Sequence, residues 1–412
     1  MKNLLISRGI RYILVFLSLL AAFTIGLVLV FCIPNGLISA NQQVSMEFIG
    51  QEGHYPQIYF QTDASQLDNY TDELMLDTTI VEDESLSPLQ AAMDMDSYAR
   101  YWHGYQIILR PALVFFSYEQ IRYLYILLFF VLLTATILAL RKKLGIPAVF
   151  AFVISLCMLY ILVLPASMQF SHVFMLTFAG ILILLWRYDP ERKQDWPLFF
   201  LVIGMLVNFV DLLTAPLLTL GMPLLVYFAL EFRYHPEAKW RKQFATLFGS
   251  SLAWGIGYGG CWLSKWLIAS PILHRNVVME ALNAILFRTG GSEEYPLERI
   301  EMFRKNLDFF LGGPGRAIPY VWLAVLIFFA AILLLFSKEK KRLPQALFFL
   351  IVALYPYAWF FVLANHSDIH AWFTYRIQGI TAFGILLFLF TMTDWKRLGD
   401  TVKKIPVFAK KN

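Results

Sequence analysis

Charged residues and cysteines are scarce in this sequence. Asp, Glu, Lys and Arg make up only 15% of the 412 residues, while 58% are hydrophobic, and soluble domains carry about 25% charged residues. A soluble fold could not bury so much apolar surface, whereas a membrane protein need not. The three cysteines, Cys32, Cys157 and Cys261, lie within or beside apolar segments and lack CxxC spacing. This pattern predicts inert buried thiols and argues against a disulfide framework.

In place of charge the sequence has a series of apolar runs long enough to cross a bilayer, since about 20 apolar residues span its core. They predict an all-α integral membrane protein, a single polytopic domain (1–412) with a bundle of about ten transmembrane helices. The first run lacks a small-residue cleavage site, so it is expected to remain as a helix. The expected spans are residues 10–33, 119–140, 146–164, 168–187, 196–212, 214–231, 244–268, 317–337, 345–364 and 372–393.

Lysine and arginine are concentrated in the short loops between these spans. With the N-terminus inside, every short basic loop falls on the cytoplasmic side, as the positive-inside rule requires. This pattern predicts a multi-pass protein of the cell membrane with both termini in the cytoplasm. The basic tail, 395–412, is expected to lie on the anionic inner leaflet. Because the net charge of +5 resides in such loops, it does not indicate a nucleic-acid partner.

Two long segments are left on the outer side, residues 34–118 and 271–316. The first is strongly acidic, with only two basic residues. Its last part, 100–118, is aromatic and apolar and carries an Arg-Pro pair, which favours a helix lying in the membrane interface over a span. The second segment is predicted to form two helices separated by a break at 290–292. Interfacial helices are therefore expected in both extracytoplasmic loops.

Ionisable residues inside or beside the expected spans are the first candidates for function, because a charge in a bilayer is costly. Arg376 is expected one or two turns into the last span, where its planar guanidinium would suit a phosphate group; an ion pair with Asp211 is the alternative. Lys265 would either make a second phosphate contact or extend to the lipid headgroups. These residues, with His172 and His370, lie near the predicted outer ends of their helices.

Three acids of the first outer segment, Asp68, Asp72 and Asp77, could serve as a general base toward a hydroxyl or hold a divalent cation. A solvated acidic loop is the alternative. Asp94 and Asp96 have the DxD spacing of metal–nucleotide sites. Nucleotide sugars are cytoplasmic, however, and this segment is expected outside.

Several histidines and one glycine-rich run complete the set of candidates. His366 and His370 are four residues apart, a spacing that could hold a metal on a helix. No third ligand is evident, so no metal site is predicted, and interfacial hydrogen bonding is expected instead. His103 and Arg110 are expected to be headgroup anchors or substrate contacts. The run 254–260 contains four glycines, which predicts close helix packing.

The layout of the chain resembles a known superfamily. A single first span leads to a large acidic outer segment, then to a Tyr-Trp-His-Gly-Tyr…Leu-Arg-Pro stretch, short-loop spans and late outer basic residues. This resembles the GT-C-type polytopic glycosyltransferases, which take sugars from polyprenyl-phosphate carriers on the outer face. The stretches 68–76, 210–216 and 372–376 are also similar to those of multi-pass membrane proteins of Gram-positive bacteria.

The resemblance implies a function and assigns roles. A catalytic acid would lie in the first outer segment: Asp72 is the first choice, with Asp77 and Asp68 next. Asp72 would activate the hydroxyl of a cell-surface glycan or glycolipid acceptor. Arg376, helped by Lys265 or His370, would stabilise the leaving polyprenyl phosphate. The partners expected are membrane lipids, a polyprenyl-phosphate-linked sugar and the acceptor, and a divalent cation is the one cofactor considered. The alternatives are a flippase for a lipid-linked sugar and a non-catalytic cell-envelope assembly protein.

Overall fold

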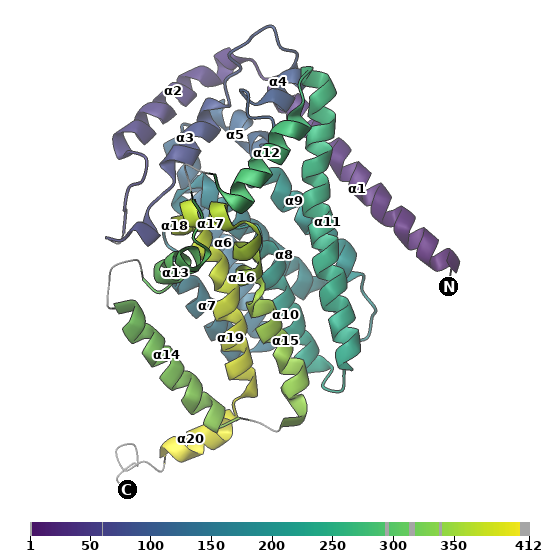
Figure 1. Ribbon diagram of the computed structural model, residues 1–412, viewed down its shortest axis with the longest axis vertical. Helices are drawn as coiled ribbons and strands as arrows, with labels where there is room; N and C mark the ends of the chain where they lie inside the picture. The colour runs from purple at the N-terminus through teal and green to yellow at the C-terminus, as the bar shows by residue number, and fades with distance from the viewer. Residues whose placement is uncertain (1, 60, 293–295, 313–317, 338–339, 404–412) are drawn as a thin grey trace.

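The protein is built from helices. The computed structural model describes residues 2–59, 61–292, 296–312, 318–337 and 340–403 (Figure 1). It is 77% helical and has no β-strand in the part of the chain that it describes, which confirms the all-α prediction. The helices, in chain order, are α1 (Lys2–Phe31), α2 (Asn35–Glu52), η1 (Asp63–Ser65), α3 (Asn69–Asp77), α4 (Pro88–Asp94), α5 (Gln106–Leu113), α6 (Tyr118–Leu144), α7 (Ile146–Cys157), η2 (Leu164–Ala166), α8 (Met168–Arg187), α9 (Trp196–Val210), α10 (Leu218–Tyr234), α11 (Trp240–Leu273), α12 (Val277–Gly290), α13 (Arg299–Phe310), α14 (Ile318–Leu335), η3 (Lys340–Arg342), α15 (Leu343–Ala353), α16 (Tyr355–Val362), α17 (Ala364–Ile369), α18 (Ala371–Thr374), η4 (Tyr375–Gln378), α19 (Gly379–Met392) and α20 (Trp395–Lys403).

Within the described residues, five helical stretches are long and apolar enough to cross a membrane. Three shorter apolar helices accompany them, at Ile146–Cys157, Trp196–Val210 and Leu326–Leu335. These helices indicate a membrane protein. Helices also occur in each of the ten ranges expected as spans, but the count of ten crossings stays a prediction. The five long stretches are Arg8–Phe31, Tyr118–Leu144, Met168–Arg187, Leu343–Val362 and Ala371–Met392.

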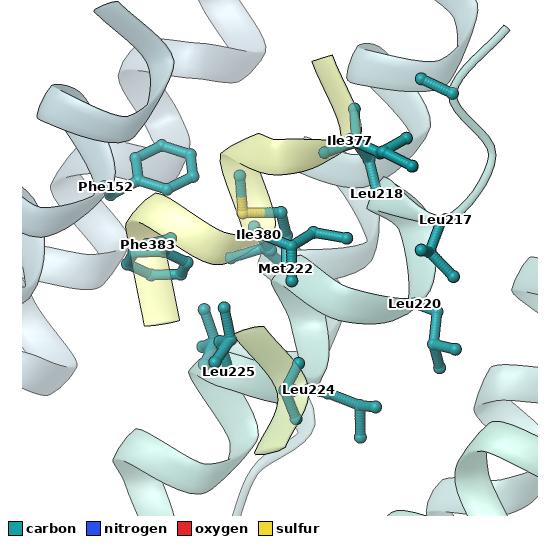
Figure 2. Packing of buried hydrophobic residues seen from close by; sticks show 14 of the residues in the cluster. Phe152, Leu217, Leu218, Leu220, Met222, Leu224, Leu225, Ile377, Ile380 and Phe383 are labelled. Carbon is teal, nitrogen blue, oxygen red and sulfur yellow. The ribbon is translucent and has the colours of Figure 1, made fainter. Parts of the chain in front are cut away.

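The centre of the bundle is α10, which is buried on every side from Leu218 to Phe232. A helix that is apolar all round belongs in such a position. It packs against α8, α9, α15 and α19. Figure 2 shows Met222 and Leu225 of α10 beside Ile380 and Phe383 of α19. The two helices can approach closely because Gly221 has no side chain: a Cβ at this position would lie 2.5 Å from the Ile380 side chain.

The contact between α9 and α11 depends on two glycines. A Cβ at Gly257 would lie 2.2 Å from the carbonyl oxygen of Leu201, and one at Gly204 would lie 2.4 Å from that of Trp254. Only residues without a side chain allow backbones to approach so closely. The prediction of close packing for the run 254–260 is thus confirmed at Gly257, whereas Gly255 meets no atom within 4 Å.

The helices of the two long segments gather at one end of the bundle. Figure 1 shows α2, α3, α4, α5 and α12 together near the C-terminal end of α11, with α20 at the opposite end. Two indoles join this layer to α11: Trp266 of α11 donates to the carbonyl of Arg100 at 2.9 Å, and Trp102 of the layer donates to the carbonyl of Cys261 in α11 at 2.9 Å. In addition, η1 of the first long segment contacts α18, close to the last apolar helix.

Candidate functional site

Arg376 lies in η4, at the start of the last long apolar stretch, and is fully buried. Its Nη2 donates to the carbonyl of Ala64 in η1 at 3.2 Å, and its Nη1 donates to the carbonyl of Trp372 at 3.2 Å. The guanidinium stacks on Phe170, 4.1 Å from the ring centroid. Among the described residues, Nε has no hydrogen-bond partner and the guanidinium forms no ion pair. Arg376 is therefore a buried cation that touches the first long segment, 34–118, and forms no salt bridge within the described residues.

Asp68, the residue before α3, is the acid that interacts electrostatically with Arg376. Its carboxyl accepts hydrogen bonds from the Thr71 amide at 3.1 Å and the Thr71 hydroxyl at 2.8 Å, an N-cap geometry. Burial and then the neighbouring Asp72 raise the pKa of Asp68 to about 7, although Thr71 and Arg376 oppose the shift. A carboxyl group with a pKa near neutrality is suited to act as a general base.

Asp72 is held differently, at the N-terminus of a second helix. Its carboxylate accepts hydrogen bonds from the Tyr118 hydroxyl, from the Met168 amide at 2.9 Å and from the Gln169 amide at 2.8 Å. Met168 and Gln169 begin α8, so the charge sits at the positive end of that helix. Burial raises the pKa of Asp72, and these three donors oppose the shift. Because both oxygens are engaged, the arrangement suits a helix cap.

A network beside Asp72 was not anticipated. Arg122 of α6 forms an ion pair with Glu52 at 2.7 Å and donates to Asn69 at 3.2 Å. Its guanidinium also lies over the Tyr118 ring, 4.9 Å from the centroid. Arg122 falls inside the expected span 119–140, so the criterion of an ionisable residue within a span would have found it.

Exposed aromatic rings lie close to Asp68. Tyr55 packs edge-on against Trp372, with 5.3 Å between ring centroids, and lies 6.4 Å from Tyr70. Tyr55 and Tyr70 are 45% and 54% exposed, which is high for tyrosines in contact with one another. His54 packs on Tyr70 at 5.4 Å. No periodic pattern in the sequence marks this group, because its members come from α3, α18 and the loop after α2.

Asp77 lies apart from Arg376, at the other end of α3. Burial first, and then Asp96, raise its pKa. Nearby, a polar cavity of about 350 Å³ is lined by both acids of the DxD pair and by Arg275. Asp94 is paired with Arg275 at 3.1 Å. In the part of the chain that the structure describes, no three His, Cys, Asp or Glu side chains are grouped so that they could hold a metal.

A second polar cluster surrounds His366, between α12 and α17. Because a carbonyl only accepts, His366 Nε2 donates to Leu213 at 2.9 Å, and Nδ1 accepts from Arg288 at 2.5 Å. The His370 ring lies 4.8 Å from that of His366. Burial lowers the pKa of His370 to about 4 and that of His366 well below its usual value, so both are neutral. Arg288 was not singled out in the sequence.

Asp211 closes the turn between α9 and α10 and does not pair with Arg376. Both of its carboxylate oxygens accept from the Thr214 amide, at 3.0 and 3.1 Å. The alternative of an Asp211–Arg376 ion pair is therefore not realised. The contacts of Asp211 are those of an aspartate at a turn.

Two other candidate cations bind the C-terminal ends of helices. Lys265 is fully buried and donates to the carbonyls of Met93 at 3.0 Å and Ala92 at 3.4 Å, at the end of α4. Arg110 donates to the carbonyls of Val30 at 3.0 Å and Ile33 at 2.7 Å, at the end of α1, and to that of Thr79, just after α3. A cation is favourable at the negative end of a helix. Neither residue lies with Arg376.

The last two histidines among the predicted site residues, His103 and His172, are each hydrogen-bonded to a tyrosine. His103 Nε2 donates to the carbonyl of Tyr98 at 3.0 Å, and Nδ1 accepts from the Tyr105 hydroxyl at 2.7 Å. Burial lowers the pKa of His103 to about 3, which keeps the ring neutral. His172 Nε2 lies 2.8 Å from the Tyr125 hydroxyl. Of the predicted site residues, the structure thus groups Asp68, Asp72 and Arg376, places His366 and His370 in a second cluster, and places Asp77, Lys265, Asp211, His103, Arg110 and His172 elsewhere.

Comparison of the chain with protein-family models, with curated proteins and with solved structures gave no match in any of the three. The function of the chain is therefore inferred from the geometry of the site and the chemistry of its residues.

Proposed function

We propose that this chain is a membrane glycosyltransferase that moves a sugar from a polyprenyl-phosphate carrier to a cell-surface glycan or glycolipid. The observation that carries the proposal is the fully buried guanidinium of Arg376, which forms no salt bridge in the part of the chain that the structure describes, although Asp68 interacts with it electrostatically. A buried charge without a partner is strongly destabilising. A phosphate group would supply the missing anion, and the planar fork of arginine matches phosphate oxygens.

An apolar groove beside the same helix supports a lipid-linked donor. It has a volume of about 470 Å³ and runs between α14 and α19, from Tyr357 and Thr381 to Phe390. Thr381 follows Arg376 by little more than one helical turn. Arg376 itself does not line the groove. An isoprenoid chain in the groove would have to direct its phosphate toward the start of this helix to reach it. The groove lies on helices that are apolar on their outer faces, as contact with membrane lipid requires.

Among the three candidate acids, Asp68 is the base we propose. Asp72 accepts hydrogen bonds from Tyr118 and from the first two amides of α8, and Asp77 lies at the other end of α3. The carboxyl of Asp68 is bonded by its own neighbour Thr71 and interacts with Arg376. Asp68 would take the proton of the acceptor hydroxyl as its oxygen attacks the anomeric carbon of the sugar. The bond from that carbon to the carrier phosphate breaks, and Arg376 stabilises the charge left on the phosphate. The exposed rings of Tyr55 and Tyr70 would offer apolar surfaces to the sugar.

The reaction would take place on the outer face of the cell membrane. This requires the ten-span topology with both termini in the cytoplasm. It is supported by the basic short loops and by the position of the α2–α5 layer at the end of the bundle away from basic α20 (Figure 1). The stretch Ala371–Met392 would then begin at the outer surface, where a carrier phosphate lies.

The test uses single substitutions that change charge or geometry with little change in size. Asp68→Asn and Arg376→Lys should abolish transfer, so that lipid-linked sugar accumulates and the surface glycan is lost. Asp77→Asn is the matched control and should leave both unchanged. Mass spectrometry of lipid extracts and surface glycans measures the result, and immunoblots measure protein abundance. Normal glycan and lipid profiles in both site variants, at normal abundance, would refute the proposal.

The two other functions make different predictions. A flippase needs a polar path through the bundle, but Phe152, Leu225 and Phe383 fill its centre (Figure 2). A non-catalytic assembly protein is favoured by one observation, that Asp72 and Lys265 bind helix ends. For such a protein, loss of surface glycan would follow loss of protein abundance in every variant. The glycosyltransferase proposal expects Asp68→Asn to lose surface glycan while protein abundance stays normal.

A further inference from the structure

An apolar cleft separates α1 from α9 and α11. It has a volume of about 440 Å³ and is lined by Phe16 and Leu17 of α1, Leu201 of α9, and Leu252 and Ile256 of α11. Leu17, Leu252 and Ile256 are each more than half exposed. Figure 1 shows α1 leaning away from α11 toward its N-terminal end.

The position of this cleft determines what can fill it. α1 contains one of the long apolar stretches, Arg8–Phe31, so the cleft faces the hydrocarbon of the membrane. Water is not a suitable occupant, because a buried water needs two to four polar partners. Close-packed apolar chains must fill the space instead. In a bilayer, the available apolar chains are those of lipids.

One end of the cleft is polar and positively charged. Tyr12, which lines it, donates its hydroxyl proton to Asp195 at 2.6 Å. Arg8 approaches the same carboxylate at 2.5 Å, and Arg11 approaches it at 3.8 Å. Two arginines share one acid, which leaves a net positive charge. Their side chains are 49% and 56% exposed, so donors remain accessible to a further anion.

We propose that this cleft binds one anionic phospholipid of the surrounding bilayer. Its acyl chain lies between α1 and α11, and its phosphate contacts Arg8 and Arg11. The lipid fills the space that α1 leaves as it diverges and attaches this helix to the bundle. The site is independent of the glycosyltransferase proposal, because it lies on other helices and involves no residue of the Asp68–Arg376 site.

The headgroup preference is tested by native mass spectrometry of the purified full-length chain, titrated with phosphatidylglycerol or phosphatidylcholine. One net positive charge should favour phosphatidylglycerol by about fivefold. Substituting both arginines by glutamine leaves the negative charge of Asp195 and should reverse the preference, in favour of phosphatidylcholine. Asp195→Asn, which removes the competing carboxylate, should increase it by about a further fivefold. Equal retention of the two lipids by the unmodified chain, or a weaker preference in Asp195→Asn, would overturn the proposal.

The acyl-chain position is tested by filling the cleft. A Cβ at Gly249, which lines it, would meet only Pro197 at 3.6 Å, an ordinary contact. Gly249→Leu should therefore fold normally and lose the retained phosphatidylglycerol. Gly255→Leu is the matched control on the same helix: that position meets nothing within 4 Å, lies outside the cleft, and should retain the lipid. Retention by Gly249→Leu at the level of the control would rule out the site.

Discussion

Asp68→Asn should remove transfer activity and, at alkaline pH, make the protein more stable. Asparagine resembles the protonated acid in shape and is an equally good N-cap. It can therefore keep the contacts with Thr71 that begin α3. What it removes is a charge that is buried in the folded state and lies near a second acid, Asp72.

The expected gain follows from the pKa of Asp68, which is raised from an ordinary 3.8 to about 7 in the folded state. The folded protein then binds this proton more tightly than the unfolded chain. The associated stability is fully present below about pH 4 and is lost as pH rises to about 7. A shift of about three pH units corresponds to about 4 kcal/mol as an upper value. Asp68→Asn should thus match the unmodified protein near pH 4 and exceed it near pH 8 by up to this amount.

Thermal unfolding in detergent micelles near pH 4 and near pH 8 measures the difference in stability. Transfer activity is followed in parallel by mass spectrometry of lipid-linked sugars. In the unmodified protein, activity should rise through about pH 7 as Asp68 ionises, because a general base acts as the carboxylate. Lower stability of Asp68→Asn near pH 8 would show that the charge is structural and would refute this reasoning. Retained activity would refute the catalytic role.

Three further substitutions test the assignments made from the fold. Asp72→Asn leaves at least one of its three donors unpaired, two of which are amides at the start of α8. The free energy of unfolding, measured by thermal unfolding, should therefore fall by about 2–4 kcal/mol. Unchanged stability with lost activity would instead identify Asp72 as the base. Lys265→Met leaves the carbonyls at the end of α4 without their cation. Proteolysis of the α2–α5 layer should therefore become faster while the bundle stays folded. Gly257→Ala places a Cβ against the α9 backbone and should destabilise by about 1–3 kcal/mol or more. The control Gly255→Ala should stabilise by up to about 1 kcal/mol.

The parts of the fold that were predictable from sequence are those encoded within single helices. Each expected span contains a helix, although some ranges hold more than one, because apolar length is a local property that needs no partner. The close packing near residue 257 was also visible, because glycines recur along one segment. What local patterns do not contain is the pairing of distant elements. Asp72 bonds to amides 96 and 97 residues further along the chain, and no spacing rule relates the two.

The choice between Asp68 and Asp72 shows why the site could not be predicted without contacts between distant parts of the chain. Position alone, in the acidic segment after the first span, favoured Asp72 over Asp68. The two residues lie one helical turn apart and are both buried. Their partners distinguish them: the amides that begin α8 bind the Asp72 carboxylate, whereas Thr71 binds the carboxyl of Asp68, which interacts with Arg376. By contrast, Arg122 was detectable, since it is an ionisable residue inside an expected span.

The partners of the buried charges provide a physical criterion for separating structural from functional groups. Asp72 binds a helix N-terminus, and Lys265 and Arg110 bind helix C-termini. In each case partial charges of the backbone compensate the ion, so its burial needs no ligand. Arg376 differs in that its two carbonyl contacts leave Nε without a partner among the described residues. Because an incompletely compensated buried cation is destabilising, this unpaired donor is the basis of our proposal that a substrate phosphate binds beside Asp68.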